Sequence, residues 1–387
     1  MSKELVIIYD TPDMTHTHIM GIHNLVYYFK FFDKIRVLYW SKEKFPEIFE
    51  RGKFVFYPYC KPYNSGYITG LKYMNWIGKT LWRICKNIPK DAKLILMPVI
   101  PIWAGLPTLI VGKIKRKKVV LRLEAEKAVY LSTEAEIEKK TFVFSFFKIF
   151  IVKIIYFLTL PLYDYVIALS EGILKEAEHY GAKKIVKIPI LIDLNPFLQI
   201  PRDKTRQGFK TILYVGQIKE IKGIFEVIEA IDMLKGEDFE FNLLIVGGVT
   251  NPKDEMFLKK IKKTINTSYV QLLGFIDHKE ISTAYEKADI FVLPSYSEAL
   301  GMAIMEAMAS GLPVIATKTS GAKDLVLDGK TGFLVPIKDE FVLKEKIKIL
   351  LENSDLRESM GRAGRKRIEE LIKKADENNK RLWQELL

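Results

Sequence analysis

Short apolar runs alternate with amphipathic helical patterns along this chain, and the alternation occurs twice. In the first half the runs have the length of buried strands and lie at residues 5–9, 35–39, 54–57, 94–97 and 119–123. A helical pattern at 20–32 and others separate most of them. The same rhythm restarts at residue 211. Because strands that alternate with helices pair in parallel, the pattern predicts two doubly wound α/β sheets of the Rossmann type.

The second half continues the rhythm to the last residues. Its expected strands lie at 211–215, 241–246, 270–273, 290–293 and 313–316, and its expected helices at 225–234, 256–265, 281–286, 303–309 and 340–353. The stretch 193–208 holds two prolines and a cluster of charges, which is typical of a linker. A last helix from about Gly364 carries apolar residues that need a partner surface: Leu382, Trp383, Leu386 and Leu387. We therefore expect domains at 1–195 and 196–365, with a C-terminal helix at 366–387 that packs back on the first.

The net charge of +13 is concentrated in the first half. Residues 1–200 hold 30 Lys and Arg against 18 Asp and Glu, whereas residues 201–387 hold 30 against 29. Such a basic half favours an anionic partner, and anionic lipid, phosphorylated substrates and nucleic acid are the candidates; solubility alone is the alternative. The aromatic residues of this half resemble core and helix residues more than a stacking platform, so nucleic acid is not expected.

Two features bear on where the protein works. Cys60 and Cys85 form neither a disulfide framework nor a metal-site spacing, and the N-terminus has no signal-peptide layout, so we expect a cytoplasmic protein. Residues 142–160 are almost wholly apolar, but Lys148 and Lys153 would each cost about 2.5–3.5 kcal/mol at the centre of a bilayer. An in-plane membrane helix beside the basic cluster at 113–118 is the favoured interpretation, and a helix buried between the two sheets is the alternative.

Residues 297–311 carry the clearest chemical pattern. An apolar strand ends at Pro294, a short loop follows, and a helix begins near Gly301. The first N–H groups of a helix, together with its dipole, favour a diphosphate, and a glycine there allows close approach. Glu306, one turn into the helix, is placed to accept both hydroxyls of a ribose, and Glu298 is placed to hold a sugar. A buried helix with two surface glutamates is the alternative interpretation.

Two glutamates separated by seven residues resemble those of the retaining nucleotide-sugar glycosyltransferases of the GT-B fold, glycosyltransferase family four. Further segments resemble the same family in the same order: 214–223, 273–276, 288–295, 311–316 and 328–335. The resemblance is dense over about 210–365 and thinner at 164–171 and 188–193 of the first half. It implies an α/β fold of the GT-B class, two Rossmann-like domains facing a central cleft, with the donor on the second domain and the acceptor on the first.

The resemblance also implies roles for individual residues. Lys222 corresponds to the lysine that neutralises the donor diphosphate, which agrees with the charge that a departing nucleoside diphosphate gains. Glu306 corresponds to the ribose ligand, and Glu298 to the residue that contacts the transferred sugar. The remaining donor-binding positions are the phosphate-loop residues Gly216 and Gln217 and the main-chain groups of Ala299, Leu300 and Gly301.

The chain departs from the family pattern at three places. Gln217 stands where arginine is usual, and a neutral amide loses the charge-assisted contact to a phosphate. Glu124 stands where many relatives have histidine; its carboxylate is a candidate for stabilising positive character at the anomeric carbon. Arg122 on the same strand is a candidate for assisting the phosphates, and a salt bridge is the alternative for both. Histidines 16, 18 and 23 stand where paired glycines are usual. Plain surface residues are the favoured interpretation, and loop contacts to acceptor or donor come next. A metal site is the least favoured, because no third ligand is evident.

We therefore expect a retaining, metal-independent hexosyltransferase of glycan biosynthesis, since the chain has no Asp-x-Asp pair. It would move a hexose from a UDP- or GDP-linked sugar to a glycan or lipid-linked acceptor, with no cofactor besides the nucleotide sugar. The basic first domain would hold it as a peripheral protein on the inner face of the cell membrane. Two alternatives stay open: a nucleotide-sugar epimerase, which shares the two-domain fold, and a binding protein whose active site has decayed, as Gln217 and the missing glycines would allow.

Overall fold

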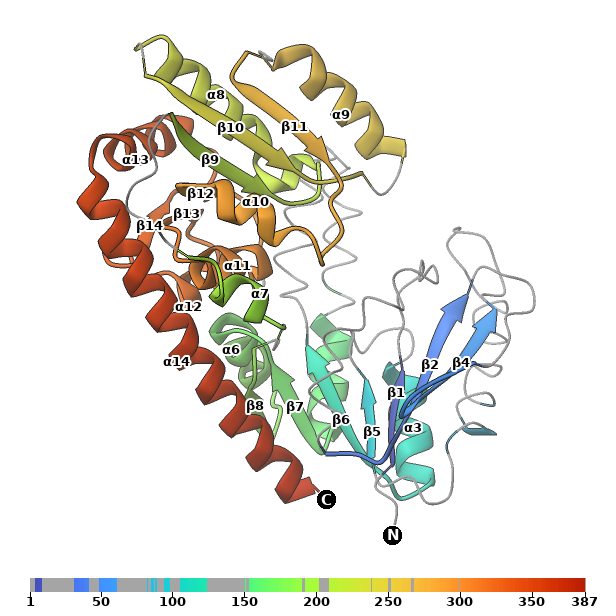
Figure 1. Ribbon diagram of the computed structural model, residues 1–387. Helices are drawn as coiled ribbons and strands as arrows, with labels where there is room; N and C mark the ends of the chain where they lie inside the picture. Colours follow the sequence, from blue (N-terminus) through green and yellow to red (C-terminus); the bar gives the residue numbers. More distant parts are fainter. Residues whose placement is uncertain are drawn as a thin grey trace. The chain divides into compact units, whose positions relative to one another are not determined.

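The chain folds as two units, each built around one sheet (Figure 1). Unit 1 comprises Met1–Ala128, Phe142–Ile192 and Ala375–Leu387, and unit 2 comprises Val129–Thr141 and Asp193–Lys374. The computed structural model describes residues 4–8, 31–41, 49–60, 82, 85, 86, 88, 94–97, 105–123, 150, 153–189, 192–201, 209–237, 239–249, 252–265, 268–298 and 300–386. The histidines of the first loop, Glu124 and Ala299 lie outside these ranges.

Unit 1 contains an eight-stranded sheet in the order β3-β4-β2-β1-β5-β6-β7-β8. All neighbouring strands pair in parallel except β3 and β4. The strands are β1 (Glu4–Ile8), β2 (Lys34–Ser41), β3 (Phe49–Arg51), β4 (Phe54–Cys60), β5 (Leu94–Met97), β6 (Lys118–Leu123), β7 (Tyr165–Ala168) and β8 (Ile185–Lys187). The apolar runs of the sequence form the central strands because parallel strands are buried on both faces. The edge strand β3 was not predicted, since three residues with one apolar side chain show no periodicity.

One face of this sheet is covered by the end of the C-terminal helix. Side chains alternate across a strand, so Leu5, Ile7, Val120, Tyr165 and Ile167 share that face. They pack with Phe32 and with the helix residues Leu382, Trp383 and Leu386. The Trp383 ring is fully buried and meets the Phe32 ring edge-on, with 5.3 Å between centroids. The apolar end of the helix therefore contributes core to unit 1.

The helices that join β5 to β8 lie on the other face, as right-handed crossovers between successive parallel strands require. They are α3 (Leu106–Ile114), a helical stretch at 153–159 followed by η3 (Leu160–Leu162), and α6 (Glu171–His179). Two of them turn large apolar side chains outward, and we call this set the unit 1 apolar surface: Leu106, Ile110, Ile114, Ile154, Phe157 and Leu158. Among the residues that the structure describes, no helix has the length and hydropathy needed to traverse a bilayer.

Unit 2 contains a six-stranded parallel sheet in the order β11-β10-β9-β12-β13-β14. The strands are β9 (Lys210–Val215), β10 (Phe241–Val246), β11 (Val270–Gly274), β12 (Ile290–Leu293), β13 (Val314–Thr317) and β14 (Gly332–Val335). The helices are α7 (Asn195–Leu198), η4 (Glu220–Lys222), α8 (Ile224–Lys235), α9 (Pro252–Thr264), α10 (Ser282–Lys287), α11 (Met302–Ala309), α12 (Ser320–Leu325) and α13 (Glu340–Glu352). β9 and β12 are the central strands, with β10 and β11 on one side and β13 and β14 on the other.

The last helix, α14 (Ser354–Leu386), begins ten residues before the position that the sequence pattern predicted. Gly361 and Gly364 lie inside it. A Cβ at Gly361 would stand 2.1 Å from the Gly311 carbonyl oxygen, so this glycine lets the helix pack closely against unit 2 backbone. Arg365 fixes the same contact, because its guanidinium donates to the carbonyl oxygens of Ala309 and Ile200, both at 2.8 Å.

Candidate functional site

The predicted donor residues of unit 2 lie on the loops that follow β9 and β12. β9 and β12 are neighbours in the sheet. The strands that follow them in sequence lie on opposite sides of this pair, β10 next to β9 and β13 next to β12. In open parallel sheets, ligands bind beyond the carboxyl ends of the strands at such a reversal. The two loops touch: the Tyr296 N–H donates to the Ile221 carbonyl oxygen at 2.9 Å. Gly223 makes the approach possible, because a Cβ there would stand 2.1 Å from the Pro294 carbonyl oxygen.

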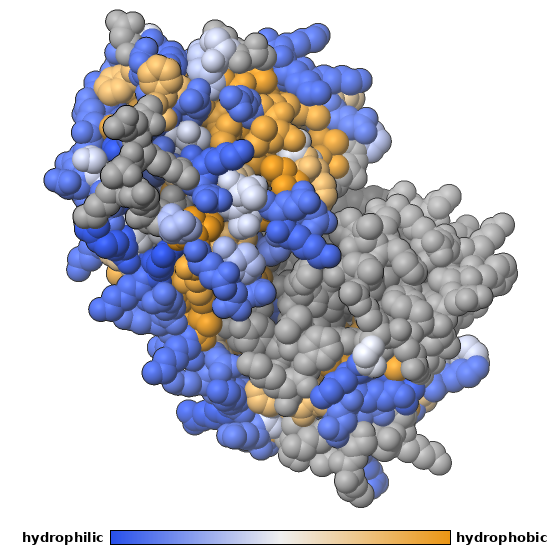
Figure 2. Space-filling view, viewed as in Figure 1, coloured by the Kyte–Doolittle hydropathy of each residue, from blue (hydrophilic) through white to orange (hydrophobic). Residues whose placement is uncertain are grey.

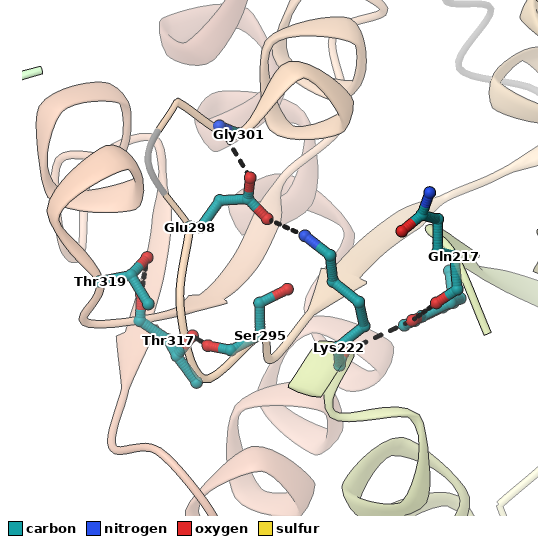
Figure 3. A network of polar contacts seen from close by, with 8 residues as sticks. Gln217, Lys222, Ser295, Glu298, Gly301, Thr317 and Thr319 are labelled. Carbon is teal, nitrogen blue, oxygen red and sulfur yellow. Dashed lines mark hydrogen bonds and ion pairs between the residues drawn. The ribbon is translucent and has the colours of Figure 1, made fainter. Parts of the chain in front are cut away.

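Lys222 and Glu298, one from each loop, form an ion pair at the start of α11 (Figure 3). The Lys222 Nζ lies 2.7 Å from Glu298 Oε2, and the side chains are 23% and 17% exposed. The Gly301 N–H donates to the other oxygen, Oε1, at 3.3 Å. Gly301 adopts a left-handed conformation (φ 75°), which a glycine tolerates, and it precedes the first helical residue. A lysine, a carboxylate and a helix N-terminus are thus brought together.

A second set of polar groups lies beside this pair, at the ends of β12 and β13. The Thr317 hydroxyl donates to the Ser295 carbonyl oxygen, and the Thr319 hydroxyl donates to the Thr317 carbonyl oxygen at 3.4 Å (Figure 3). Ser295 is buried, and its own hydroxyl has no hydrogen-bond partner among the described residues. The threonines hold the backbone from which Glu298 projects.

The first phosphate-loop residues, Gly216 and Gln217, follow β9 directly. The buried Tyr214 hydroxyl donates to the carbonyl oxygens of Gln217 and Lys222, at 3.3 and 3.4 Å, and so ties the two ends of the loop together. Burial, with the nearby Glu298 and Glu226 carboxylates, raises the pKa of Tyr214 well above its usual value, so this hydroxyl stays protonated. The loop also packs closely against Gly247, because a Cβ at Gly247 would stand 1.8 Å from the Gly216 carbonyl oxygen. Gln217 is exposed.

Glu306 lies on the inner side of α11, 5% exposed. The Tyr285 hydroxyl donates to its Oε2 at 2.6 Å, and the His278 Nε2 lies 3.0 Å from its Oε1. The hydrogen bond to Glu306 raises the pKa of His278, with partial burial opposing the shift and Asp277 and Asp193 adding to it. Sequence reasoning missed both partners, although a tyrosine on a buried helix face signals a hydroxyl that needs an acceptor.

The turn after β11 carries an exposed apolar edge. Figure 2 shows hydrophobic side chains gathered on this side of unit 2, in the area of β10 and β11. Leu273 and Phe275 are 44% and 79% exposed. Gly248, after β10, lies under the Phe275 ring: a Cβ there would stand 3.2 Å from the Phe275 Cβ. The segment 273–276, which resembles the family pattern, therefore presents an aromatic ring at the carboxyl end of the sheet.

The remaining predicted residues divide between the described and undescribed parts of the chain. Leu300 is buried between the loop and α11. Glu124 and Ala299 lie outside the described residues. Arg122, two residues before Glu124, is 4% exposed in β6. The structure therefore brings together Lys222, Glu298 and Gly301, with the other described donor positions on the same loops or on α11.

Comparison with known proteins finds similarity mainly in the part of the chain that forms unit 2. Residues 198–367 match the family model of the glycosyl transferases group 1. The capsular polysaccharide biosynthesis glycosyltransferase CapM of Staphylococcus aureus is 28% identical over 240 residues, which are 57% of this chain and 60% of CapM. The chain thus spans less than two thirds of that relative's length.

Solved structures resemble the chain over almost its whole length. Sucrose-phosphate synthase from Thermosynechococcus elongatus superposes with a TM-score of 0.77 at 19% identity, over 99% of both chains. Anabaena Alr3699/HepE in complex with UDP and glucose superposes with a TM-score of 0.69 at 16% identity, over 97% of this chain and 98% of that one. These similarities give the fold, which is GT-B. The chain has the GT-B fold, and its residues 198–367 match the glycosyl transferases group 1 model.

Proposed function

We propose that the protein is a retaining glycosyltransferase that moves a hexose from a UDP- or GDP-linked sugar to a glycan or lipid-linked acceptor at a membrane surface. The observation that carries the proposal is the meeting of Lys222 and Glu298 at the start of α11, beyond the carboxyl ends of β9 and β12. A cation beside a helix N-terminus suits a diphosphate, and a neighbouring carboxylate suits sugar hydroxyls.

The reaction breaks the bond between the anomeric carbon and a donor phosphate oxygen and forms a bond from that carbon to an acceptor oxygen, in the same configuration. The acceptor hydroxyl gives up its proton, and the diphosphate departs with one more negative charge and can take up that proton. Lys222, the free N–H groups at the start of α11 and the loop at Gly216 would stabilise that charge. Because Gln217 offers an amide in place of a cation, Lys222 carries more of this task, and Glu124 remains a candidate for the anomeric carbon. No Asp-x-Asp pair is present, so we propose a metal-independent reaction.

The other donor groups follow from the geometry of α11 and the turn after β11. Glu306 would bind the ribose, and the Phe275 ring would pack against the flat face of the base. Glu298, with the main-chain groups of Ala299, Leu300 and Gly301, would hold the transferred sugar.

The membrane part of the proposal rests on the unit 1 apolar surface and its charge. Residues 106, 110 and 114 form one stripe of α3, and Phe157 and Leu158 are 68% and 61% exposed on the next helix. Contiguous exposed apolar side chains indicate an interface. Arg116, in the turn that follows α3, and Lys153, at the start of the next helix, are exposed, and residues 1–200 carry 12 more basic than acidic residues. This charge complements anionic lipid headgroups, so we propose a peripheral location on the inner face of the cell membrane.

Vesicle co-sedimentation tests the membrane part. The full chain should sediment with vesicles that contain anionic lipid and much less with zwitterionic ones. Phe157→Ser combined with Leu158→Ser should reduce sedimentation, whereas Phe341→Ser, which changes a 64% exposed phenylalanine of unit 2, should not. Equal behaviour with both kinds of vesicle, or an unaffected double variant, would count against membrane binding.

A thermal-shift screen across UDP- and GDP-sugars tests the donor part. A ligand present at about 100 times its dissociation constant stabilises the folded state by about 2.7 kcal/mol, which is measurable as a higher melting temperature. We expect one donor class to stabilise the wild-type chain and Lys222→Ala to lose most of the shift. Product analysis then separates the alternatives: free nucleoside diphosphate indicates transfer or hydrolysis, and an intact nucleotide sugar with inverted stereochemistry indicates an epimerase. Binding without turnover indicates a decayed enzyme.

A further inference from the structure

The carboxylate of Glu306 is almost wholly covered by two side chains from other elements. Tyr285 of α10 donates to Oε2 from a fully buried position, and its ring stacks on Phe291 of β12 with 5.9 Å between centroids. His278 approaches Oε1 from the turn after β11, and its side chain is 44% exposed. Tyr285 is thus fixed by packing, whereas His278 has solvent on one side.

The position of His278 is set by charges from three segments. Glu306 of α11 lies 3.0 Å from its Nε2, and Asp277 of its own turn and Asp193, just ahead of α7, add negative potential. Phe197 of α7 meets the imidazole edge-on, with 6.0 Å between centroids. The three carboxylates favour the protonated ring, and partial burial opposes it. Protonation therefore strengthens the hold of His278 on Glu306.

We propose that His278 covers the place on Glu306 that a nucleotide ribose must reach, so that nucleotide binding displaces this imidazole and is coupled to proton release. The inference rests on the proposed function, in which Glu306 binds the ribose. A carboxylate has lone pairs for four hydrogen bonds, but the Glu306 side chain is only 6% exposed, which leaves little open surface for two hydroxyls. Of its two partners, only His278 has room to rotate toward solvent.

The coupling has a definite sign. When His278 is protonated, the ribose competes with a charge-assisted hydrogen bond, and when His278 is neutral it competes with a weaker one. Displacement removes the group that raises the pKa of His278, so this pKa falls toward its ordinary value and a proton leaves. Nucleotide affinity should therefore increase as the pH rises through the pKa of His278 in the folded protein.

Isothermal titration calorimetry with UDP and GDP at pH 6.0 and pH 8.5 tests the proposal on the full chain. The terminal phosphate of a nucleotide itself titrates near pH 6, so the comparison between variants is the readout. Loss of a charge-assisted competitor should make His278→Ala bind about 5- to 10-fold more tightly than wild type at pH 6.0 and within about 2-fold at pH 8.5. His179→Ala, which removes an exposed histidine of α6 in unit 1, should behave as wild type.

Two further experiments test whether His278 and the ribose hydroxyls compete for Glu306. His278→Gln keeps a side chain without the titrating proton, so it should remove the part of the pH dependence that His278 contributes, even if His278→Ala proves unstable. With 2′,3′-dideoxy nucleotides, which lack the ribose hydroxyls, His278→Ala should give no gain. Weaker binding by His278→Ala, or the same gain with dideoxy nucleotides, would overturn the inference alone. Absence of binding by UDP and GDP at both pH values would overturn the proposed function as well.

Discussion

Replacing Lys222 by alanine separates the two tasks that the donor site assigns to this side chain. The Nζ lies 2.7 Å from Glu298 Oε2, and both side chains are less than a quarter exposed. Without the cation, the Glu298 carboxylate keeps the hydrogen bond from the Gly301 N–H, at 3.3 Å, as its side-chain contact among the described residues. Exposed pairs contribute about 0.2–1 kcal/mol and the breaking of buried ones costs about 3–5, so we expect a loss of about 1–2 kcal/mol in the free energy of unfolding.

The loss in donor turnover should be larger than this loss in stability. A hydrogen-bond donor or cation that stabilises the charge developing in the transition state contributes about 3–4 kcal/mol. Its removal should therefore lower kcat/KM about 100- to 1,000-fold. Release of nucleoside diphosphate measures the rate, and urea unfolding measures the stability. Lys344→Ala is the matched control, because Lys344 also forms a 2.7 Å ion pair, with Glu237, away from the site. A folded Lys222→Ala with kcat/KM within about 3-fold of wild type would refute the reasoning.

Three further substitutions test other parts of the account. Gly223→Ala places a Cβ 2.1 Å from the Pro294 carbonyl oxygen at a φ of 70°, so urea unfolding should show a loss of about 2 kcal/mol or more; an unchanged midpoint would contradict the close approach of the two loops. Trp383→Ala should lower the free energy of unfolding by about 3–5 kcal/mol, and a loss below about 1 would contradict its place in the core of unit 1. Tyr285→Phe removes a hydrogen bond to Glu306 and should weaken nucleotide binding about 5-fold by calorimetry, whereas unchanged affinity would show that Glu306 needs no such support.

Local sequence pattern located most strands of both sheets, but not β3, β7, β8 or β14. Val119 and Leu293 belong to apolar runs that end within one residue of the strands in the structure, because a parallel strand buried on both faces must be apolar throughout. The start of α14 was placed ten residues late, since Gly361 and Gly364 interrupt the helical pattern. Gly361 serves a close contact with Gly311, which is distant in sequence, and no local pattern reveals such a contact.

The site was predictable to the same degree. Lys222, Glu298 and Gly301 could be named from the sequence because spacing and glycine positions mark the loops after two strands. The ion pair between Lys222 and Glu298 could not be predicted from the sequence. The two residues are close only because β9 and β12 are neighbours in the sheet. His278 and Tyr285 were missed for the same reason: each reaches Glu306 from an element that lies more than 20 residues earlier.

The carboxylate of each of the two glutamates already accepts hydrogen bonds from neighbouring side chains. Lys222 neutralises Glu298, and His278 and Tyr285 occupy Glu306. If the site binds a nucleotide sugar, as we propose, the ligand must exchange with side chains that already hold these carboxylates in place. Such exchange lowers the net gain from each new contact, because only the difference between the old and new partners adds to affinity.

Release of nucleoside diphosphate from a panel of UDP- and GDP-sugars, by the wild-type chain and by Glu306→Ala, tests the central claim most directly. If the loops after β9 and β12 with α11 form a donor site, the wild-type chain releases nucleoside diphosphate from at least one donor, and Glu306→Ala, still folded by circular dichroism, loses that release. Equal release by both proteins, or no release by the wild type from any donor with acceptor lipids and glycans present, would contradict it.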